Sequence, residues 1–163
     1  PPRPAEEVLM SHHVRVVFDT NVLLSLFVFK DSRFAPLRGE VVCGRWIALT
    51  SPACLAEFRR VLNYPLFALD EAQQESTLAA YLALVQIVES EPRLDVILPK
   101  CKDRDDQKFL ELARDGRADW LVSADKLVLR LRRGRHLAGL FQILTPDEAL
   151  QKVGVGVTAS PSA

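Results

Sequence analysis

Short runs of β-branched and apolar residues alternate along this chain with longer stretches in which apolar residues recur at helical spacing. The short runs predict strands over residues 14–18, 46–49, 94–98, 120–122 and 141–144. The longer stretches predict helices over residues 21–30, 35–44, 53–62, 70–89, 103–115, 126–133 and 146–152. Start and stop signals support these boundaries, since Pro52 follows a hydroxyl residue, Asp70 precedes a helix and Gly116 ends one.

The alternation of strands and helices predicts an α/β fold. Parallel strands need crossover connections, and helices supply them. We therefore expect a three-layer α/β/α sandwich around a central parallel sheet of four to five strands. The ordered domain is expected to span residues 14–152. Residues 1–13 and 153–163 are rich in proline, glycine, serine and other small residues, and we expect loosely ordered ends there.

Four acidic residues fall where ligands bind in open parallel sheets, beyond the carboxyl ends of the strands. Asp19 directly follows the first predicted strand, and Asp125 lies three residues after the strand 120–122. Asp106 lies near the start of a helix that follows a strand, and Glu57 lies early in another such helix. Four separate segments would thus bring carboxylates to one edge of the sheet.

Asp106 is the most informative of these acids. Phe109, Leu110 and Ala113 follow it by three, four and seven residues, so Asp106 shares the apolar face of its helix. A carboxylate that points inward is costly unless it is paired or bound to a metal. The alternative is a first-turn carboxylate stabilised by the helix dipole, with Asp103 or Asp105 as the cap.

The other three acids also have structural interpretations when they are taken singly. Asp19 suits a turn or cap after a strand, Asp125 suits the start of a short helix, and Glu57 lies on the flank of its helical stripe. Together, however, four like charges at one edge repel each other unless a cation is bound. Oxygen ligands favour Mg²⁺ or Mn²⁺, and no histidine or cysteine is spaced for zinc.

Composition narrows the functional classes. Hydrophobic residues make up 48% and charged residues 26% of the chain, which is typical of globular proteins. Because 21 basic and 21 acidic residues cancel, binding to a nucleic acid would require a local basic patch. The densest basic stretch follows Asp125. We hypothesise that some of its members contact the phosphates of a nucleic acid, the alternative being a solvated helix end: Lys126, Arg130, Arg132, Arg133 and Arg135.

Location is predicted from what the sequence lacks. No apolar run reaches the roughly 18 residues of a membrane helix, and the first residues lack the features of a signal peptide. Cys43, Cys54 and Cys101 are widely spaced and suggest reduced, mostly buried thiols. We therefore expect a cytoplasmic protein without a membrane association.

Four segments together resemble the PIN domain, and the closest group is the toxin component of prokaryotic type II toxin–antitoxin systems. The segments are VVFDTNVLLS, LAEFRRVL, CKDRDDQKFLELA and DWLVSADKLVL, and the similarity spans about residues 14–150. The resemblance implies a PIN-like fold and a Mg²⁺- or Mn²⁺-dependent endoribonuclease acting on single-stranded RNA. It further implies a cognate antitoxin as partner, and a homodimer is a second expectation.

The resemblance also implies roles for particular residues. The four family acids, which bind metal and catalyse, correspond to Asp19, Glu57, Asp106 and Asp125; Asp106 is preferred to Asp103 and Asp105 because it lies three residues before an aromatic. Polar positions that steady the acids or the metal correspond to Thr20, Asn21 and Ser123. One departure is Leu127, which stands where many relatives carry a further acid.

Other classes fit the sequence less well. A haloacid dehalogenase-type phosphatase needs a second aspartate where Asn21 stands, and a dinucleotide-binding domain needs a glycine-rich turn after the first strand. A receiver domain would use an aspartate on a middle strand and a late lysine. A PIN-like module that binds RNA or protein without catalysis is the alternative from a different functional class.

Overall fold

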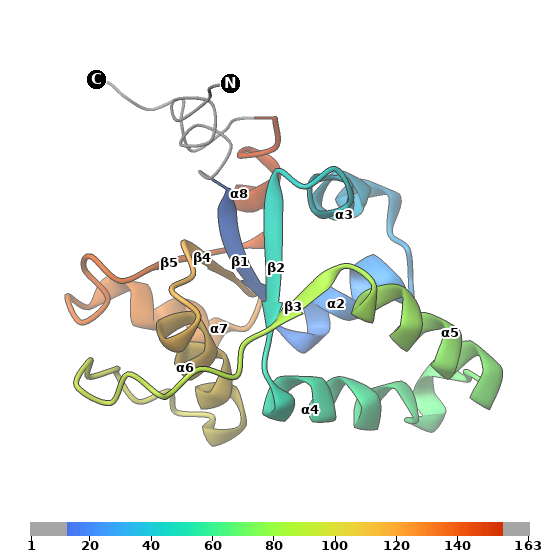
Figure 1. The fold of residues 1–163 in the computed structure, drawn as a ribbon, viewed down its shortest axis with the longest axis horizontal. Helices are drawn as coiled ribbons and strands as arrows, with labels where there is room; N and C mark the ends of the chain where they lie inside the picture. The colour runs from blue at the N-terminus through green and yellow to red at the C-terminus, as the bar shows by residue number, and fades with distance from the viewer. Residues whose placement is uncertain (1–12, 155–163) are drawn as a thin grey trace, which may run out of the picture.

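The central element of the fold is one parallel sheet of five strands. A computed structural model describes residues 13–154. The strand order is β3-β2-β1-β4-β5, so the first strand of the chain lies in the middle (Figure 1). Each neighbouring pair is parallel, and the strands are β1 (Val14–Phe18), β2 (Trp46–Thr50), β3 (Val85–Ile87), β4 (Trp120–Val122) and β5 (Gln142–Leu144).

Helices connect these strands. The α-helices of the described residues are α2 (Thr20–Phe27), α3 (Ala35–Val42), α4 (Pro52–Leu62), α5 (Glu71–Leu82), α6 (Gln107–Asp115), α7 (Lys126–Leu129) and α8 (Pro146–Leu150). Short 3₁₀ turns add η1 (Ser32–Phe34), η2 (Pro65–Phe67), η3 (Arg104–Asp106) and η4 (Arg130–Arg133). The predicted starts are confirmed at α4, where Ser51 caps the helix, and at α5, where Asp70 and Gln73 form a capping box.

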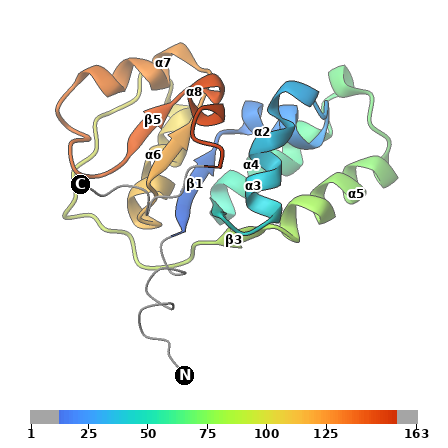
Figure 2. The same ribbon diagram turned by 90° about the horizontal axis from the view of Figure 1, so that it is seen from above.

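Two hydrophobic cores lie on opposite faces of the sheet. Val14, Val16 and Phe18 alternate along β1 with Val17 and face the two cores in turn, because successive strand residues point to opposite sides. The first core includes buried residues of α2, α3, α4, α5 and α8, and the second includes α6 and α7. In Figure 2 these two groups of helices lie on either side of the sheet. The predicted three-layer α/β/α sandwich is therefore confirmed.

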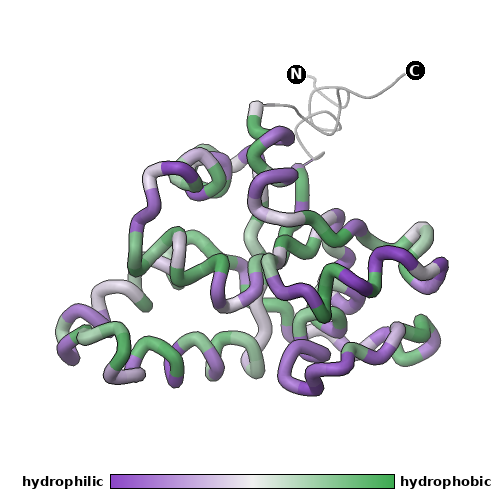
Figure 3. Tube along the Cα trace, turned by 180° about the vertical axis from the view of Figure 1, so that it is seen from behind, coloured by the Kyte–Doolittle hydropathy of each residue, from purple (hydrophilic) through white to green (hydrophobic). Residues whose placement is uncertain are grey.

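The outer helices are amphipathic in the way this layering requires. Hydrophobic and hydrophilic residues alternate along these helices in Figure 3. On α6, Phe109, Leu110 and Ala113 are buried, as the sequence pattern predicts. Cys54 and Cys101 are buried free thiols, whereas the free thiol of Cys43 is exposed. No helix among residues 13–154 combines the length and hydrophobicity needed to cross a membrane.

The predicted strand over residues 94–98 is wrong. The third strand is β3, within the predicted helix 70–89, because α5 ends at Leu82 and Val85 pairs beside Ala48 of β2. Residues 94–98 lie between two prolines that lack an amide donor, and Leu94 is 71% exposed. A long irregular crossover therefore leads from β3 to α6. The ends predicted to be loose lie almost entirely outside the described residues.

Packing around α6 gives a stability prediction. Leu110 has no exposed surface, so Leu110→Ala is expected to lower the free energy of unfolding by about 2–5 kcal/mol. The matched control is Leu94→Ala, which removes the same atoms from an exposed side chain and should cost less than about 0.5 kcal/mol. Urea unfolding of both variants measures the difference, and equal losses would mean that α6 does not pack as described.

Candidate metal centre

Asp19 lies at the centre of the sheet edge where β1 ends. Its side chain is buried and caps α2, with Oδ1 accepting a hydrogen bond from the amide of Val22 at 3.0 Å. Its Oδ2 accepts a hydrogen bond from the Ser123 hydroxyl at 2.5 Å. Burial raises the pKa of Asp19 to about 6, and the nearby charges of Asp125 and Glu57 add to that rise.

Ser123 connects Asp19 with Asp125. The serine is fully buried at the end of β4, beside β1, and its hydroxyl oxygen also accepts a hydrogen bond from the amide of Asp125 at 3.0 Å. Asp125 in turn caps α7, with Oδ1 accepting from the amide of Leu127 at 2.8 Å. Asp19 and Asp125 therefore both act as helix caps, and the Ser123 hydroxyl links the two residues.

Asp106 supplies a carboxylate oxygen that lacks a partner. Its Oδ2 is buried and has no hydrogen bond among the described residues. One carboxylate oxygen from each of Asp103, Asp106 and Asp125 lies within 4.8 Å of the others. Burial raises the pKa of Asp106 to about 7, and the carboxylates of Asp125, Asp103 and Asp19 contribute further. The inward orientation predicted for Asp106 is thus observed.

This donor set fits a hard divalent cation. The three grouped ligand atoms are all carboxylate oxygens, which suit Mg²⁺ and Mn²⁺ rather than zinc. A dication would give the buried Asp106 Oδ2 a partner and would offset the repulsion that raises the pKa of these acids. Asp103, Asp106 and Asp125 are the residues that could hold the ion directly, with Asp19 beside them.

Glu57 lies close to this group but is engaged by other residues. Its Oε1 accepts a hydrogen bond from the Thr20 hydroxyl, and its Oε2 lies 2.9 Å from Lys108 Nζ and 3.9 Å from an Arg60 nitrogen. The Thr20 hydroxyl thus holds one oxygen of the Glu57 carboxylate. Asn21 is exposed, and its side chain makes no hydrogen bond to any residue between 13 and 154.

Two residues near the acids were not singled out by the sequence. Asp103 was set aside in favour of Asp106, yet it joins the group while its Oδ1 caps η3 by accepting from the Asp105 amide. The signal for it was the closeness of the aspartates in the run DRDD. Nothing local marks Lys108, because its partner Glu57 is on a different helix.

The predicted basic stretch is exposed, and one of its members forms an ion pair with an acidic residue. Arg132 donates to Glu148 at 2.7 Å, so part of its charge is neutralised. The other four members make no ion pair with any described residue: Lys126, Arg130, Arg133 and Arg135.

A second basic group lies along the crossover that leads to η3. It borders a hollow of about 560 Å³ and comprises Lys100, Lys102 and Arg104, all exposed. Gln107 holds this segment against α6, since it accepts from the Cys101 amide at 2.7 Å and donates to the Pro99 carbonyl at 3.1 Å. These cations directly flank the grouped aspartates in the chain.

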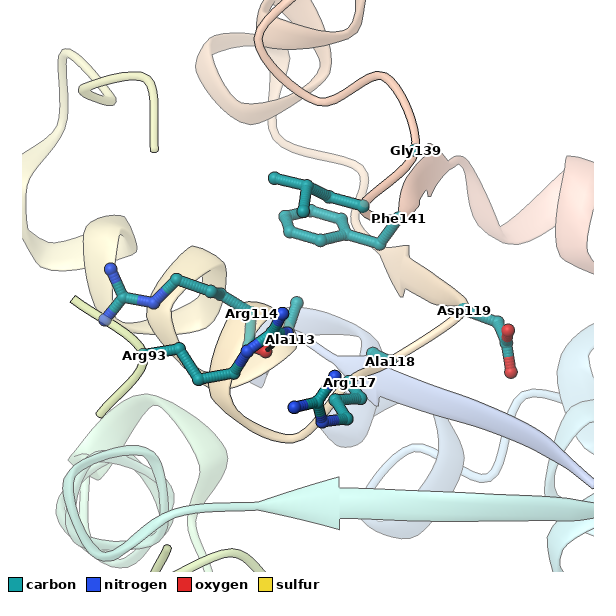
Figure 4. A pocket seen from close by; sticks show the side chains of 9 residues that line it. Arg93, Ala113, Arg114, Arg117, Ala118, Asp119, Gly139 and Phe141 are labelled. Atoms are coloured by element: carbon teal, nitrogen blue, oxygen red, sulfur yellow. Dashed lines mark hydrogen bonds between the residues drawn. The ribbon is translucent and has the colours of Figure 1, made fainter. Parts of the chain in front are cut away.

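A separate hollow of about 230 Å³ lies at the opposite end of the sheet, where β4 and β5 begin. Figure 4 shows Phe141 across the hollow from Arg93 and Arg114, while Asp119 points away. Arg114 is paired with Asp115 at 2.8 Å, and Arg93 donates to the Arg114 carbonyl. These arginines belong to the amino end of the strands, away from the carboxylates.

Comparison with known families agrees with this geometry. The family model described as PIN domain matches residues 15–127, and this chain belongs to the PIN-domain family. Members of this family are in general metal-dependent nucleases, so a nuclease-type function follows for a chain that carries an acidic cluster. A search of curated proteins found no match.

The raised pKa values give a pH prediction for the metal-free protein. A carboxyl whose pKa is higher in the folded chain stabilises the fold below its unfolded pKa and loses that contribution as pH rises through the folded pKa. With the pKa of Asp106 at about 7, the free energy of unfolding should fall between about pH 4 and pH 7. Asp106→Asn should flatten this dependence.

Urea unfolding in a chelator at several pH values measures the slope. Asp105→Asn is the matched control, because Asp105 is an exposed neighbour outside the grouped carboxylates. It should keep the parental slope. If Asp106→Asn kept the parental pH dependence of the free energy of unfolding, the Asp106 carboxyl would not be the source of that dependence.

Proposed function

We propose that this protein is a Mg²⁺- or Mn²⁺-dependent endoribonuclease that hydrolyses single-stranded RNA. The observation that carries the proposal is the buried, unpartnered oxygen of Asp106 beside Asp103 and Asp125. Membership of the PIN-domain family supports it, because the family consists in general of metal-dependent nucleases. The preference for single-stranded RNA rests on the sequence resemblance.

Each acid has a distinct task in this proposal. Asp106 and Asp125 hold the metal directly, with Asp103 on the outer side of the group. Asp19 adds negative charge beside this group and is kept in place by Ser123 and the amide of Val22. Glu57 is oriented by Thr20 and contributes to the charge around Asp19.

The reaction we propose is direct hydrolysis without a covalent intermediate. A bound dication lowers the pKa of water and offsets the negative charge that develops on the phosphate. The oxygen of water bonds to phosphorus as the bond to the 3′ oxygen breaks, and that oxygen takes a proton. The products are a 5′ phosphate and a 3′ hydroxyl. No nucleophilic side chain is required.

The phosphates of RNA are repelled by a group of carboxylates, so binding requires positive charge nearby. Two basic groups flank the acids along the chain. Lys100, Lys102 and Arg104 precede and surround Asp103, while Lys126 directly follows Asp125. We assign phosphate contacts to both groups, the second extending through Arg130, Arg133 and Arg135. Arg132 takes a lesser part because it is paired with Glu148.

The sequence resemblance also supports a proposal about the biological role of the protein. On the sequence resemblance we propose a cytoplasmic toxin of a toxin–antitoxin pair, with an antitoxin that covers the acids. Among the apolar residues of α2, η2 and the segment after α2, Leu24 and Phe27 are buried, whereas Phe29 is 57% and Leu66 is 84% exposed. We assign any partner or dimer contact to these exposed side chains. We also propose that the PIN-like domain spans residues 14–152.

Loss of one acid should abolish cleavage. Asp19→Asn is expected to reduce the rate of cleavage of single-stranded RNA in Mn²⁺ by at least roughly 100-fold, because a buried carboxylate that acts on the metal-binding group is removed. Asp105→Asn, with its exposed carboxylate, should keep the parental rate. A gel assay of a labelled RNA with and without chelator measures both.

The outcomes separate the two functional classes. RNA binding without cleavage by the parent chain would favour a PIN-like binding module. Equal cleavage by the parent chain and Asp19→Asn would point to a contaminating nuclease. Growth arrest in bacteria by the parent chain but not by Asp19→Asn is the result expected of a toxin.

The salt dependence of RNA binding should report on the two basic groups. Each lost phosphate contact lowers the slope of log K against log salt by about 0.7 for a single strand, so Lys102→Ala with Arg104→Ala should lower it by about 1.4. Arg130→Ala with Arg133→Ala is expected to do the same. Binding is measured in Ca²⁺ to prevent turnover.

The control is Lys152→Ala, since the Lys152 ammonium lies 6.0 Å from the Trp120 ring at the other end of β4. It should leave the slope unchanged. A pair of substitutions that also leaves the slope unchanged would remove that group from the proposed RNA surface.

A further inference from the structure

The proposed function gives no role to the ion pair between Lys108 and Glu57. Lys108 lies two residues after Asp106 on α6, and its ammonium reaches Glu57 Oε2 on α4 at 2.9 Å. Both side chains are largely buried, with 19% of Lys108 and 14% of Glu57 exposed. Removal of one partner from a buried ion pair destabilises the fold much more than removal of one partner from an exposed pair.

The charge of Glu57 is already offset by neighbouring cations. Its Oε1 is taken by the Thr20 hydroxyl, and its Oε2 is shared by Lys108 and the more distant Arg60. By contrast, Asp106 has a buried oxygen without a partner, and the atoms grouped with it come from Asp103 and Asp125. The carboxylates near the sheet edge therefore divide into a set that lacks a cation and one member that already has one.

We infer that the Lys108 ammonium takes the place of a second metal ion at Glu57, so that this site binds a single dication on the side of Asp103, Asp106 and Asp125. The inference rests on the proposed metal-dependent function and specifies the number of metals in it. A dication at Glu57 would have to displace the ammonium and leave that charge in a largely buried position, which is unfavourable.

The ammonium also has the chemistry to assist at a phosphate. An ammonium carries three N–H donors. The described residues use two of them, because Lys108 donates to Glu57 and to the backbone carbonyl of Asp105. The third donor is available to an anionic oxygen of a substrate held at the neighbouring carboxylates. Lys108 would thus hold a fixed positive charge that chelators do not remove.

Counting bound Mn²⁺ tests the inference without reference to activity. Titration of the full chain, followed by electron paramagnetic resonance of free Mn²⁺ and by calorimetry, should give one bound ion. Lys108→Met removes the charge but keeps the length of the side chain, and it should give two. Lys108→Arg should give one, since it restores the cation.

Two further variants locate the second ion. Lys108→Met combined with Glu57→Gln should return to one bound ion, because the vacated carboxylate is gone. Lys102→Met is the matched control: it removes an exposed lysine beside Asp103 and should keep one bound ion. If it gave two, a general loss of positive charge would explain the result and the inference would fall.

The unsubstituted chain alone can overturn the inference, so the test does not depend on the folding of Lys108→Met. Two bound ions in that chain would overturn the single-metal inference while leaving the proposed nuclease intact. No bound ion would overturn the proposed metal-dependent function itself. One ion in both the unsubstituted chain and a folded Lys108→Met, checked by circular dichroism, would show that Lys108 does not replace a metal.

Discussion

Electrostatic repulsion among carboxylates at one edge of the sheet is the constraint on which the site depends. Asp19, Asp106 and Asp125 come from different segments, and burial together with the neighbouring carboxylates raises the pKa of Asp19 and of Asp106. The fold tolerates this because helix caps and the Ser123 hydroxyl stabilise particular oxygens. Among the described residues, Asp106 Oδ2 is buried and has no hydrogen-bond partner. A cation bound at this oxygen would supply one.

Much of the fold follows from the sequence because buried parallel strands are continuously apolar. Apart from Arg15, β1 is such a strand, and it was predicted with its observed bounds. β3 was missed because it is a short edge strand directly after α5, where local composition still favours a helix. The prolines around residues 94–98 were the available evidence against the strand placed there.

The candidate site was predictable only where function and local structure coincide. Asp19 and Asp125 follow strands, and Asp106 shares an apolar helical face, so position alone brought them forward. The pairing of Glu57 with Lys108 was not predictable, because a contact between two helices leaves no trace in the periodicity of either. For the same reason the partial neutralisation of Arg132 by Glu148 became visible only in three dimensions.

The hydrogen bond between Ser123 and Asp19 depends on how β4 is aligned with β1. Ser123 meets Asp19 because Phe18 is paired with Val122, which places the two following residues side by side. A slip of β4 by one position would turn Ser123 to the other face of the sheet and leave Asp19 without its hydroxyl donor. Misaligned molecules would thus lack this contact even when compact, so the geometry around Asp19 forms only when the sheet is correctly assembled.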